Sequence, residues 1–343
     1  MGNRVLKNTA RHLLLFLAAV AGLELLLNAR SGFSNTLPNF FQPGAGGTAY
    51  VLKHGRHRYL HRGRPVNVSI NGQGHRYSPG GDRNENSAPQ RVVLIGDSQV
   101  FGWGLDDAET LSNRLQAHIG PDYRVINKGL PGTGPWSYWE SAAEETPDTI
   151  LVTVYTEIND GQDSYTRDTF ARVNCSTLVV PGGPAETLPC WMMETALFSF
   201  IVDARNMLSP YHLAPPINCN PLTRSAAAVI QTRIETLDQR LDIFPKRIRL
   251  AIPWDARIDS RRLANYRPVL AQAQCFWAFP GDIDLVSHMT SAENRLDLFQ
   301  RDDQHLSAEG VDLVAALLAR HILARHPATT GEEQNQKAQA PIK

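Results

Sequence analysis

The chain has 343 residues, of which 42% are hydrophobic and 20% are charged. This apolar content is enough for one large core or two small ones, so a largely disordered chain is excluded. Lysine and arginine together number 34, as do aspartate and glutamate. No net charge therefore attracts nucleic acid, and we expect no nucleic-acid partner.

The first predicted element is an apolar segment at residues 13–27. Arg4, Lys7 and Arg11 precede it without an acidic residue, a charge order that keeps the N-terminus in the cytoplasm and predicts export of the rest of the chain. The run is shorter than the roughly 20 apolar residues of a spanning helix, and Glu24 interrupts it. An uncleaved anchor and a cleaved signal peptide both stay open. We favour the anchor because no small-x-small cleavage site comes after the segment; a buried core helix is the weakest alternative.

A linker and a small β region separate this N-terminal part, residues 1–28, from the main domain. Residues 29–48 are rich in Gly, Pro, Asn and Ser, which predicts a linker that lifts the domain off the membrane. We expect the folded part to begin near Tyr50. Residues 49–90 are predicted to form a flanking β region that contains a hairpin, because alternating apolar and polar side chains precede Asn71-Gly72.

Residues 91–326 carry the pattern of a largely parallel α/β sheet. Short apolar runs alternate with amphipathic stretches, two of which follow the candidate caps Thr110 and Ser307. The predicted strands are 92–95, 123–126, 150–155 and 248–252, and the predicted helices have apolar faces within 111–119, 230–241 and 311–322. Residues 161–222 show no period and predict an insertion over the active-site edge, whereas the tail 327–343 is predicted to be disordered.

Four cysteines lie in the second half of the chain, namely Cys175, Cys190, Cys219 and Cys275. An even count in an exported protein permits two disulfides, in any of three pairings. We expect Cys175 to pair with Cys190, which closes a short loop inside the insertion, and Cys219 to pair with Cys275 by elimination. Metal binding is a weaker alternative because no CxxC or zinc-finger spacing is present, and four reduced, buried thiols are the remaining one.

A candidate nucleophile, Ser98, ends the tripeptide Gly-Asp-Ser directly after the predicted strand 92–95. There the chain has to turn sharply into a helix at the carboxyl end of a parallel strand, the edge where α/β sheets bind ligands. The N–H groups at the start of that helix are placed to stabilise an oxyanion. The alternative is that Ser98 only caps a helix, because this tripeptide also arises by chance.

A candidate base, His305, follows Asp302 by three residues, just before the last helix. In a tight turn this spacing lets the Asp302 carboxylate reach a ring nitrogen of His305. It would then fix the tautomer and stabilise the imidazolium that forms when Ser98 loses its proton. We choose Asp302 for this role over the neighbouring Asp303. The alternative is a surface or capping histidine, since an Asp three residues before a His is a common chance pairing.

Two loops, after the predicted strands 123–126 and 150–155, lead to the same edge as Ser98. The first contains Gly132 and the second contains Asn159. A glycine lets backbone N–H groups approach a reacting carbonyl, and an asparagine amide is a neutral donor. With the Ser98 N–H they would complete an oxyanion hole. The alternative is plain turn chemistry, because Gly and Asn are usual after strands.

These blocks together resemble the SGNH hydrolase family, which is named for a Ser in a GDS motif, a Gly, an Asn, and a His in a C-terminal DxxH motif. The resemblance covers residues 91–325. It implies a three-layer α/β/α, flavodoxin-like fold with a doubly wound, mostly parallel sheet of about five strands. It also implies catalysis without metal or cofactor, with Ser98 as nucleophile, Gly132 and Asn159 joining the Ser98 N–H in the oxyanion hole, and Asp302 and His305 as acid and base.

Two positions depart from, or vary within, the pattern that is resembled. Glu157 stands where the third block usually has a glycine, which puts the local geometry before Asn159 in doubt. Gln99 comes directly after Ser98 at a position that varies within the family.

The function implied by the resemblance is an exported serine esterase that hydrolyses an O-acyl ester, preferably O-acetyl, through an acyl-Ser98 intermediate. Acylated small molecules or cell-surface polysaccharides are the expected substrates. Trp103 and Trp136 are weak candidates for binding them, with core packing as the alternative. Two other functions stay open: a polysaccharide O-acetyltransferase that works with a membrane acyltransferase partner, and a non-catalytic carbohydrate-binding domain. We expect a membrane-anchored protein with its domain in the periplasm or at the cell exterior.

Overall fold

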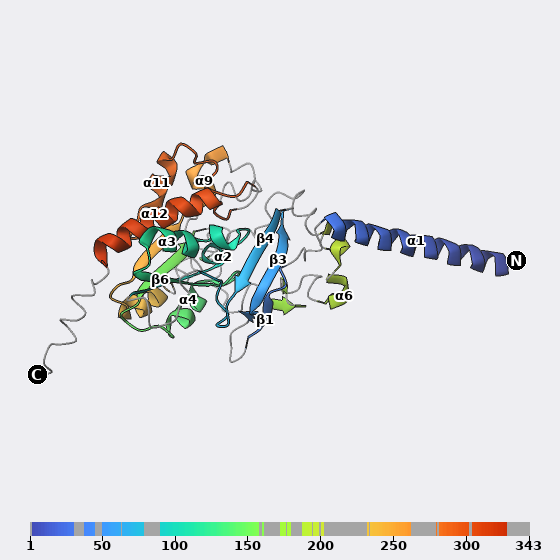
Figure 1. Ribbon diagram of the computed structural model, residues 1–343, viewed down its shortest axis with the longest axis horizontal. Helices are drawn as coiled ribbons and strands as arrows, with labels where there is room; N and C mark the ends of the chain where they lie inside the picture. The colour runs from blue at the N-terminus through green and yellow to red at the C-terminus, as the bar shows by residue number, and fades with distance from the viewer. Residues whose placement is uncertain are drawn as a thin grey trace, which may run out of the picture.

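The structure is a computed structural model that describes residues 2–30, 38–44, 50–62, 64–78, 90–157, 160, 172–175, 177–179, 187–193, 195–198, 200–201, 232, 234–261, 279, 281–301 and 304–327. A parallel sheet lies at the centre of the main domain, with helices on both faces, and α1 (Gly2–Arg30) extends away from it (Figure 1). The fold is therefore of the α/β class.

The central sheet contains four parallel strands in the order β10-β7-β5-β6. They are β5 (Gln90–Gly96), β6 (Tyr123–Gly129), β7 (Ile150–Thr156) and β10 (Ile248–Ile252). All four coincide with predicted strands. The central sheet thus has four parallel strands among the described residues, where about five were expected. Residues 262–278, which come after β10 in the chain, lie outside the described part. The chain runs from β5 to β6 on one side and then crosses to β7 on the other. The strand order therefore reverses at β5, which is where such folds bind ligands.

Neighbouring residues along β5 point to opposite faces, and each face carries its own apolar core. Val92 and Leu94 face the core formed with α3 (Leu111–Ile119), α11 (Leu285–Ser291) and α12 (Ala308–Arg325). Val93 and Ile95 face the core formed with α4 (Pro135–Ala142) and part of 234–244. Burial on both faces explains the uninterrupted apolar runs in β5 and β7, and the two cores give the three-layer arrangement that the sequence predicted.

The two candidate helix caps differ in what their side chains do. The Ser307 hydroxyl accepts a hydrogen bond from the Gly310 N–H at 3.1 Å, so it caps α12 as predicted. Thr110 occupies the N-cap position of α3, but its side chain makes no capping bond and donates instead to the Asp107 carbonyl at 2.9 Å. That carbonyl belongs to the short 3-10 helix η1 (Asp107–Glu109), which competes for the hydroxyl.

The flanking β region forms a hairpin of β3 (Gly55–His61) and β4 (Arg64–Ile70). The two strands close with His61 opposite Arg64, so the hairpin does not turn at Asn71-Gly72. The Asn71 turn instead returns the chain to Arg76, which bridges to Ile70 and also to Asn127 in β6. The hairpin is therefore joined to the edge of the main sheet.

Ordered structure also begins earlier than near Tyr50. Within the predicted linker, β1 (Phe41–Pro43) pairs with β2 (Tyr50–Leu52) in antiparallel register. Phe40 and Phe41 are fully buried in a third core that includes Phe101. Two adjacent aromatic rings bury enough apolar area to hold this segment on the domain. The Gly- and Pro-rich sequence around the two rings led to the prediction of a linker instead.

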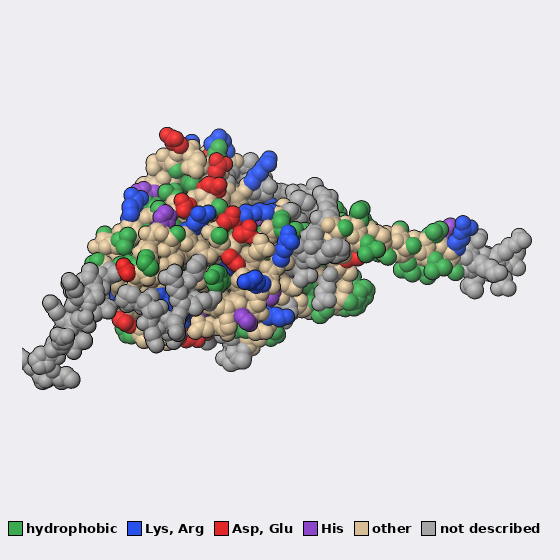
Figure 2. All heavy atoms as spheres, viewed as in Figure 1, with side chains coloured by type: hydrophobic (Ala, Val, Ile, Leu, Met, Phe, Trp, Pro, Cys, Tyr) green, Lys and Arg blue, Asp and Glu red, His purple; other side chains and the backbone are tan. Residues whose placement is uncertain are grey.

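The helix α1 contains an apolar stretch at Thr9–Ala29, 21 residues long, that is long enough to cross a membrane and has none of its length buried. Figure 2 shows hydrophobic side chains along it, with basic side chains toward its free end. Because the stretch is exposed, the interpretation as a core helix is wrong.

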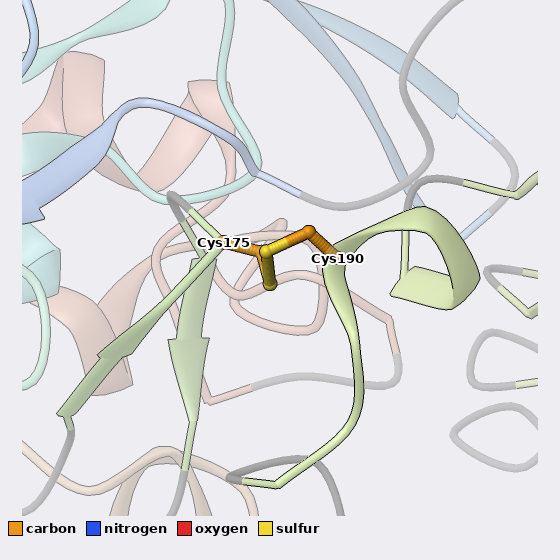
Figure 3. Close-up of a disulfide and its surroundings, with 2 residues drawn as sticks. All are labelled: Cys175 and Cys190. Carbon is orange, nitrogen blue, oxygen red and sulfur yellow. A yellow bond between two sulfur atoms is a disulfide. The ribbon is translucent and has the colours of Figure 1, made fainter.

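The described parts of the insertion are a short hairpin, β8 (Arg172–Asn174) with β9 (Thr177–Val179), and a short helix, α6 (Cys190–Met193). A disulfide joins Cys175, in the turn of the hairpin, to Cys190 at the start of α6 (Figure 3). The predicted pairing of these two cysteines is confirmed. Cys219 and Cys275 lie outside the described residues.

Candidate active site

Ser98 is the first residue of a four-residue helix, α2 (Ser98–Phe101), directly after β5. The Asp97 side chain caps this helix by accepting the Gln99 N–H at 2.9 Å. Two glycines that are register partners, Gly96 and Gly129, let α2 lie against the strand ends. A Cβ added to Gly129 would fall 2.2 Å from the Phe101 nitrogen, and one added to Gly96 would fall 2.5 Å from the Val100 side chain. Only glycine fits at these positions with α2 so close.

Ser98 and His305 lie in direct contact. The Ser98 Oγ and the His305 Nε2 are 2.7 Å apart, although the residues are separated by 207 positions in the chain. Both side chains are half-buried. When the imidazole is neutral with its proton on Nδ1, the Ser98 hydroxyl donates this hydrogen bond to Nε2, which is the arrangement that a general base requires.

Gln99, the residue after Ser98, joins α2 to the segment that carries His305. Its Nε2 donates to the Gln304 carbonyl at 3.2 Å, and its Oε1 accepts the Leu306 N–H at 3.1 Å. The Gln99 side chain thus holds the residues immediately before and after His305. Gln99 is 5% exposed, so water competes poorly for these bonds. The turn that aims Ser98 therefore also fixes the backbone that aims His305.

A second glutamine, Gln300, holds the other side of the His305 segment. The Gln300 N–H donates to the His305 carbonyl at 2.8 Å. Its side-chain Nε2 donates to the Trp103 carbonyl at 2.8 Å and to the Leu306 carbonyl at 3.2 Å. Its Oε1 lies 3.1 Å from the His61 Nε2, at the end of β3. The β3–β4 hairpin is thus linked to the segment that holds the base.

Acidic and hydroxyl side chains join the ends of β5 and β7. The Thr156 hydroxyl donates to the Asp97 carboxylate at 3.1 Å, and the Thr156 N–H donates to Asp160 at 2.8 Å. The Tyr138 hydroxyl, from α4, donates to both carboxylate oxygens of Asp160 at 2.9 and 3.0 Å. Asp97 and Asp160 are fully buried. These bonds fix the backbone on both sides of residues 158–159 at the edge that holds Ser98.

Glu157, which stands where the resembled pattern has a glycine, is buried and hydrogen-bonded. Its carboxylate accepts the Trp254 N–H at 3.0 Å and pairs with the Arg257 guanidinium, which belongs to α9 (Asp255–Ile258). Its N–H donates to the Ile252 carbonyl at 3.1 Å. Glu157 therefore ties the end of β7 to the loop after β10, a structural use for a carboxylate at this position.

The Arg76 side chain holds the loop after α2 through hydrogen bonds to backbone carbonyls. Its guanidinium, fully buried, donates to the carbonyls of Asn67, Phe101, Gly102 and Leu105 at distances from 2.6 to 3.2 Å and pairs with Asp107 at 3.3 Å. It also lies over the Phe101 ring, 4.7 Å from its centroid. Burial lowers the pKa of Arg76, and the Asp107 carboxylate opposes this effect. One cation thus satisfies four backbone carbonyls, three of which lie at the end of α2 or in the loop after it.

Of the other residues predicted for the triad and the oxyanion hole, the structure describes Gly132. Gly132 has a φ of +71° and comes after β6, whose loop begins with a bond from the Leu130 N–H to the Gly96 carbonyl at 3.0 Å. It is thus close in the chain to the edge that holds Ser98. Asn159, Asp302 and Asp303 lie outside the described residues. No group of three or more His, Cys, Asp or Glu side chains in the described part is placed to hold a metal ion.

Neither of the aromatic candidates, Trp103 and Trp136, is fully exposed. Trp103 is half-buried and packs against the rings of Tyr59 and His61, with centroids 5.7 and 6.4 Å away. Trp136 is half-buried in the first turn of α4. Tyr155 is core, stacked on Phe279 at 5.0 Å, and burial raises the pKa of its hydroxyl.

The sequence did not assign a role to four residues that hold the site together, namely Arg76, Asp97, Gln99 and Gln300. Three of them are next to a motif or within six residues of it, but side chains of this kind are common on surfaces. The only available signal was the position of Asp97 and Gln99 on either side of Ser98, where burial forces each polar group to find a partner.

Comparisons with known proteins bear on the fold alone. No protein-family model matches the chain, and no curated protein matches it. Among solved structures, the chain is similar to a lipase/acylhydrolase from Enterococcus faecalis, with a TM-score of 0.34 and 16% identity over 71% of this chain and 100% of that one. It is also similar to TesA, with a TM-score of 0.32 and 14% identity over 68% of this chain and 98% of that one. These values assign no role to any residue, and the α/β fold rests on the order and direction of the four strands.

Proposed function

We propose that the chain is a serine esterase that hydrolyses an O-acyl ester, preferably O-acetyl, through an acyl-Ser98 intermediate. The observation that carries the proposal is the 2.7 Å contact between the Ser98 Oγ and the His305 Nε2. It lies at the carboxyl end of β5, where the strand order reverses. Buried hydrogen bonds from Gln99 hold the residues immediately before and after His305, so the pair is pre-organised for proton transfer.

The chemistry starts from that pair. The Ser98 oxygen attacks the acyl carbon while its proton passes to the His305 Nε2, and a tetrahedral oxyanion forms. The Ser98 N–H, in the first turn of α2, has no acceptor within the helix and faces the developing charge. Collapse of the intermediate breaks the ester bond as His305 returns the proton to the leaving alcohol. Water then attacks the acyl-Ser98 ester in the same way, and the acid is released.

Gly132 and Asn159 are proposed as the further oxyanion donors, and Asp302 as the acid that orients His305. Support comes from the loop after β6, which begins at the edge that holds Ser98, and from Asp160, whose bonds fix the backbone next to Asn159. Asn159→Ala should lower turnover by roughly a hundred- to a thousandfold with little change in apparent substrate affinity. Full activity of this variant would remove Asn159 from the site.

We also propose that α1 anchors the protein in a membrane and that the domain lies outside the cytoplasm. The exposed apolar stretch of α1 and the basic residues before it support the orientation. The disulfide between Cys175 and Cys190 supports an oxidising compartment. In that location acylated cell-surface polysaccharides are within reach of the domain, and they are our preferred substrate.

The test compares the wild type with Ser98→Ala on short- and long-chain aryl esters and on acetylated glycans. We expect hydrolysis and covalent labelling by an organophosphonate in the wild type, and neither in the variant. Labelling without hydrolysis, accompanied by acyl transfer to an added glycan, would replace the esterase with an acetyltransferase. Glycan binding that persists without any labelling of the wild type would indicate a non-catalytic binding domain.

A further inference from the structure

Glu24 is the acidic residue in the apolar stretch of α1, and the structure shows what its carboxylate binds. The Glu24 carboxylate accepts the Ala196 N–H at 2.6 Å and the Leu197 N–H at 2.8 Å. These N–H groups begin a helical turn that Thr195 caps, since the Thr195 hydroxyl accepts the Phe198 N–H at 3.1 Å. The first N–H groups of a helix have no partner within it, so Glu24 satisfies donors that would otherwise remain unpaired. The insertion is thereby bonded to α1.

The position of Glu24 along α1 sets the depth of this contact. The apolar stretch of 21 residues is about 31 Å long at about 1.5 Å per residue, which matches a hydrocarbon core of about 30 Å. Glu24 stands five residues before the end of the stretch at Ala29, which places it about 7–8 Å below that end. If α1 spans a bilayer, any segment bonded to Glu24 enters the outer boundary of the membrane.

The segment at residues 187–201 has the composition that this boundary requires. It contains one charged residue, Glu194. Its side chains at Trp191, Phe200 and Ile201 are 71%, 45% and 56% exposed. Among the five tryptophans that the structure describes, Trp191 alone is exposed. Large apolar side chains in this number are unfavourable in water, whereas tryptophan is enriched where lipid headgroups meet acyl chains.

These exposed side chains lie beside α1 rather than elsewhere on the domain. Figure 1 places α6 next to the end of α1 that joins the domain, and Figure 2 shows hydrophobic side chains gathered there. On α1 itself, Leu25 and Leu26, which come directly after Glu24, are 68% and 66% exposed. The disulfide at Cys190 fastens the residue before Trp191 to the β8–β9 hairpin. The segment is thus held at two points, by a covalent bond and by Glu24.

We propose that residues 187–193, 195–198 and 200–201 form a membrane-contacting platform that inserts Trp191, Phe200 and Ile201 into the headgroup and acyl-chain boundary beside α1. The occupant of this surface is phospholipid. The inference rests on the proposed anchoring by α1 and goes beyond it, because a single helix joined to the domain by a linker would leave the domain free to swing. A second contact fixes the side of the domain that faces the membrane.

The test measures tryptophan fluorescence of the full chain in phosphatidylcholine vesicles whose acyl chains carry bromine close to the headgroup, against vesicles without bromine. Bromine quenches only tryptophans that reach the lipid. We expect Trp191→Phe to remove most of the quenched emission, whereas the matched variant Trp254→Phe, at a buried position, leaves it unchanged. Equal quenching in Trp191→Phe and the wild type would overturn the platform.

A second pair of variants tests the link to α1. Glu24→Leu keeps the helix apolar but removes both acceptor oxygens, so we expect it to lower the quenching of Trp191 by more than half. Glu24→Gln keeps one acceptor oxygen and should retain most of it. Sedimentation with the vesicles at alkaline pH reports the anchor separately. Recovery of the chain in the supernatant would refute the anchor and the platform together. Sedimentation without quenching of Trp191 would refute the platform alone.

Discussion

Replacement of Gln99 by leucine is expected to lower turnover by loosening His305 while leaving Ser98 in place. Leucine is similar in size to glutamine but is apolar. The variant therefore lacks both the donor to the Gln304 carbonyl and the acceptor of the Leu306 N–H. Gln304 and Leu306 are 8% and 2% exposed, so water replaces these bonds poorly. An unsatisfied buried polar group costs about 1–3 kcal/mol, which gives a loss of roughly 2–6 kcal/mol for the two groups.

Part of this loss acts on the position of His305. If the productive placement of the segment loses about 1.4–2.7 kcal/mol relative to others, turnover falls roughly 10- to 100-fold. The assay is kcat for an aryl ester, together with the rate of labelling by an organophosphonate, which also needs the base. We expect both to fall, and we expect the pH dependence of kcat/KM to change because the imidazole sits in a less fixed environment.

A control separates this effect from general destabilisation. Leu115→Ala removes a fully buried side chain from α3 and should cost about 2–5 kcal/mol in unfolding free energy, with kcat and its pH profile unchanged in the folded protein. Gln99→Leu with wild-type turnover and pH profile would refute the reasoning. So would an equal loss of kcat in Leu115→Ala.

Three further predictions concern the frame of the site. Gly129→Ala should destabilise the fold and abolish labelling of Ser98, because the added Cβ would fall 2.2 Å from the Phe101 nitrogen; normal labelling in a folded variant would contradict this close packing. Arg76→Met should lower the free energy of unfolding by about 3–5 kcal/mol in urea titration, since it leaves buried carbonyls and Asp107 without their cation; a loss below about 1 kcal/mol would show that water replaces the guanidinium. Burial, with Lys128 nearby, lowers the pKa of His75 to about 4, so the unfolded chain binds a proton more readily and stability should fall as the pH drops from about 6.5 to about 4. His75→Leu should flatten this part of the urea-derived stability curve by on the order of 2 kcal/mol, and an unchanged curve would exclude His75 as the cause.

The four parallel strands of the central sheet were predictable from the sequence because each contains a short run of buried, largely apolar residues. In β5 and β7, burial on both faces makes this run longer. The Ser307 cap was equally clear, since Ser directly before an apolar helical pattern is a local signal. A local signal of this kind can still be overridden, as at Thr110, whose hydroxyl binds the Asp107 carbonyl instead of capping α3.

Features that depend on distant partners were not predictable. Asn71-Gly72 is a strong turn signal, and a turn forms there, but the strand that pairs with β4 precedes it in the chain. Phe40 and Phe41 lie in a stretch with a linker's composition, and only the core that they enter makes them structural. The structural role of Glu157 was not predictable either, because its partners lie about a hundred residues further on in the chain.

The pairing of Ser98 with His305 shows why motif spacing was informative while the side chains that support it were not. The motif positions are fixed by chemistry, so their residue types recur and resemble those of a known family. The support can be provided by any buried group that both donates and accepts hydrogen bonds. Glutamine does this without a charge, so the single side chain of Gln99 both donates to the Gln304 carbonyl and accepts from the Leu306 N–H. This role became visible only once the neighbours of Gln99 in space were known.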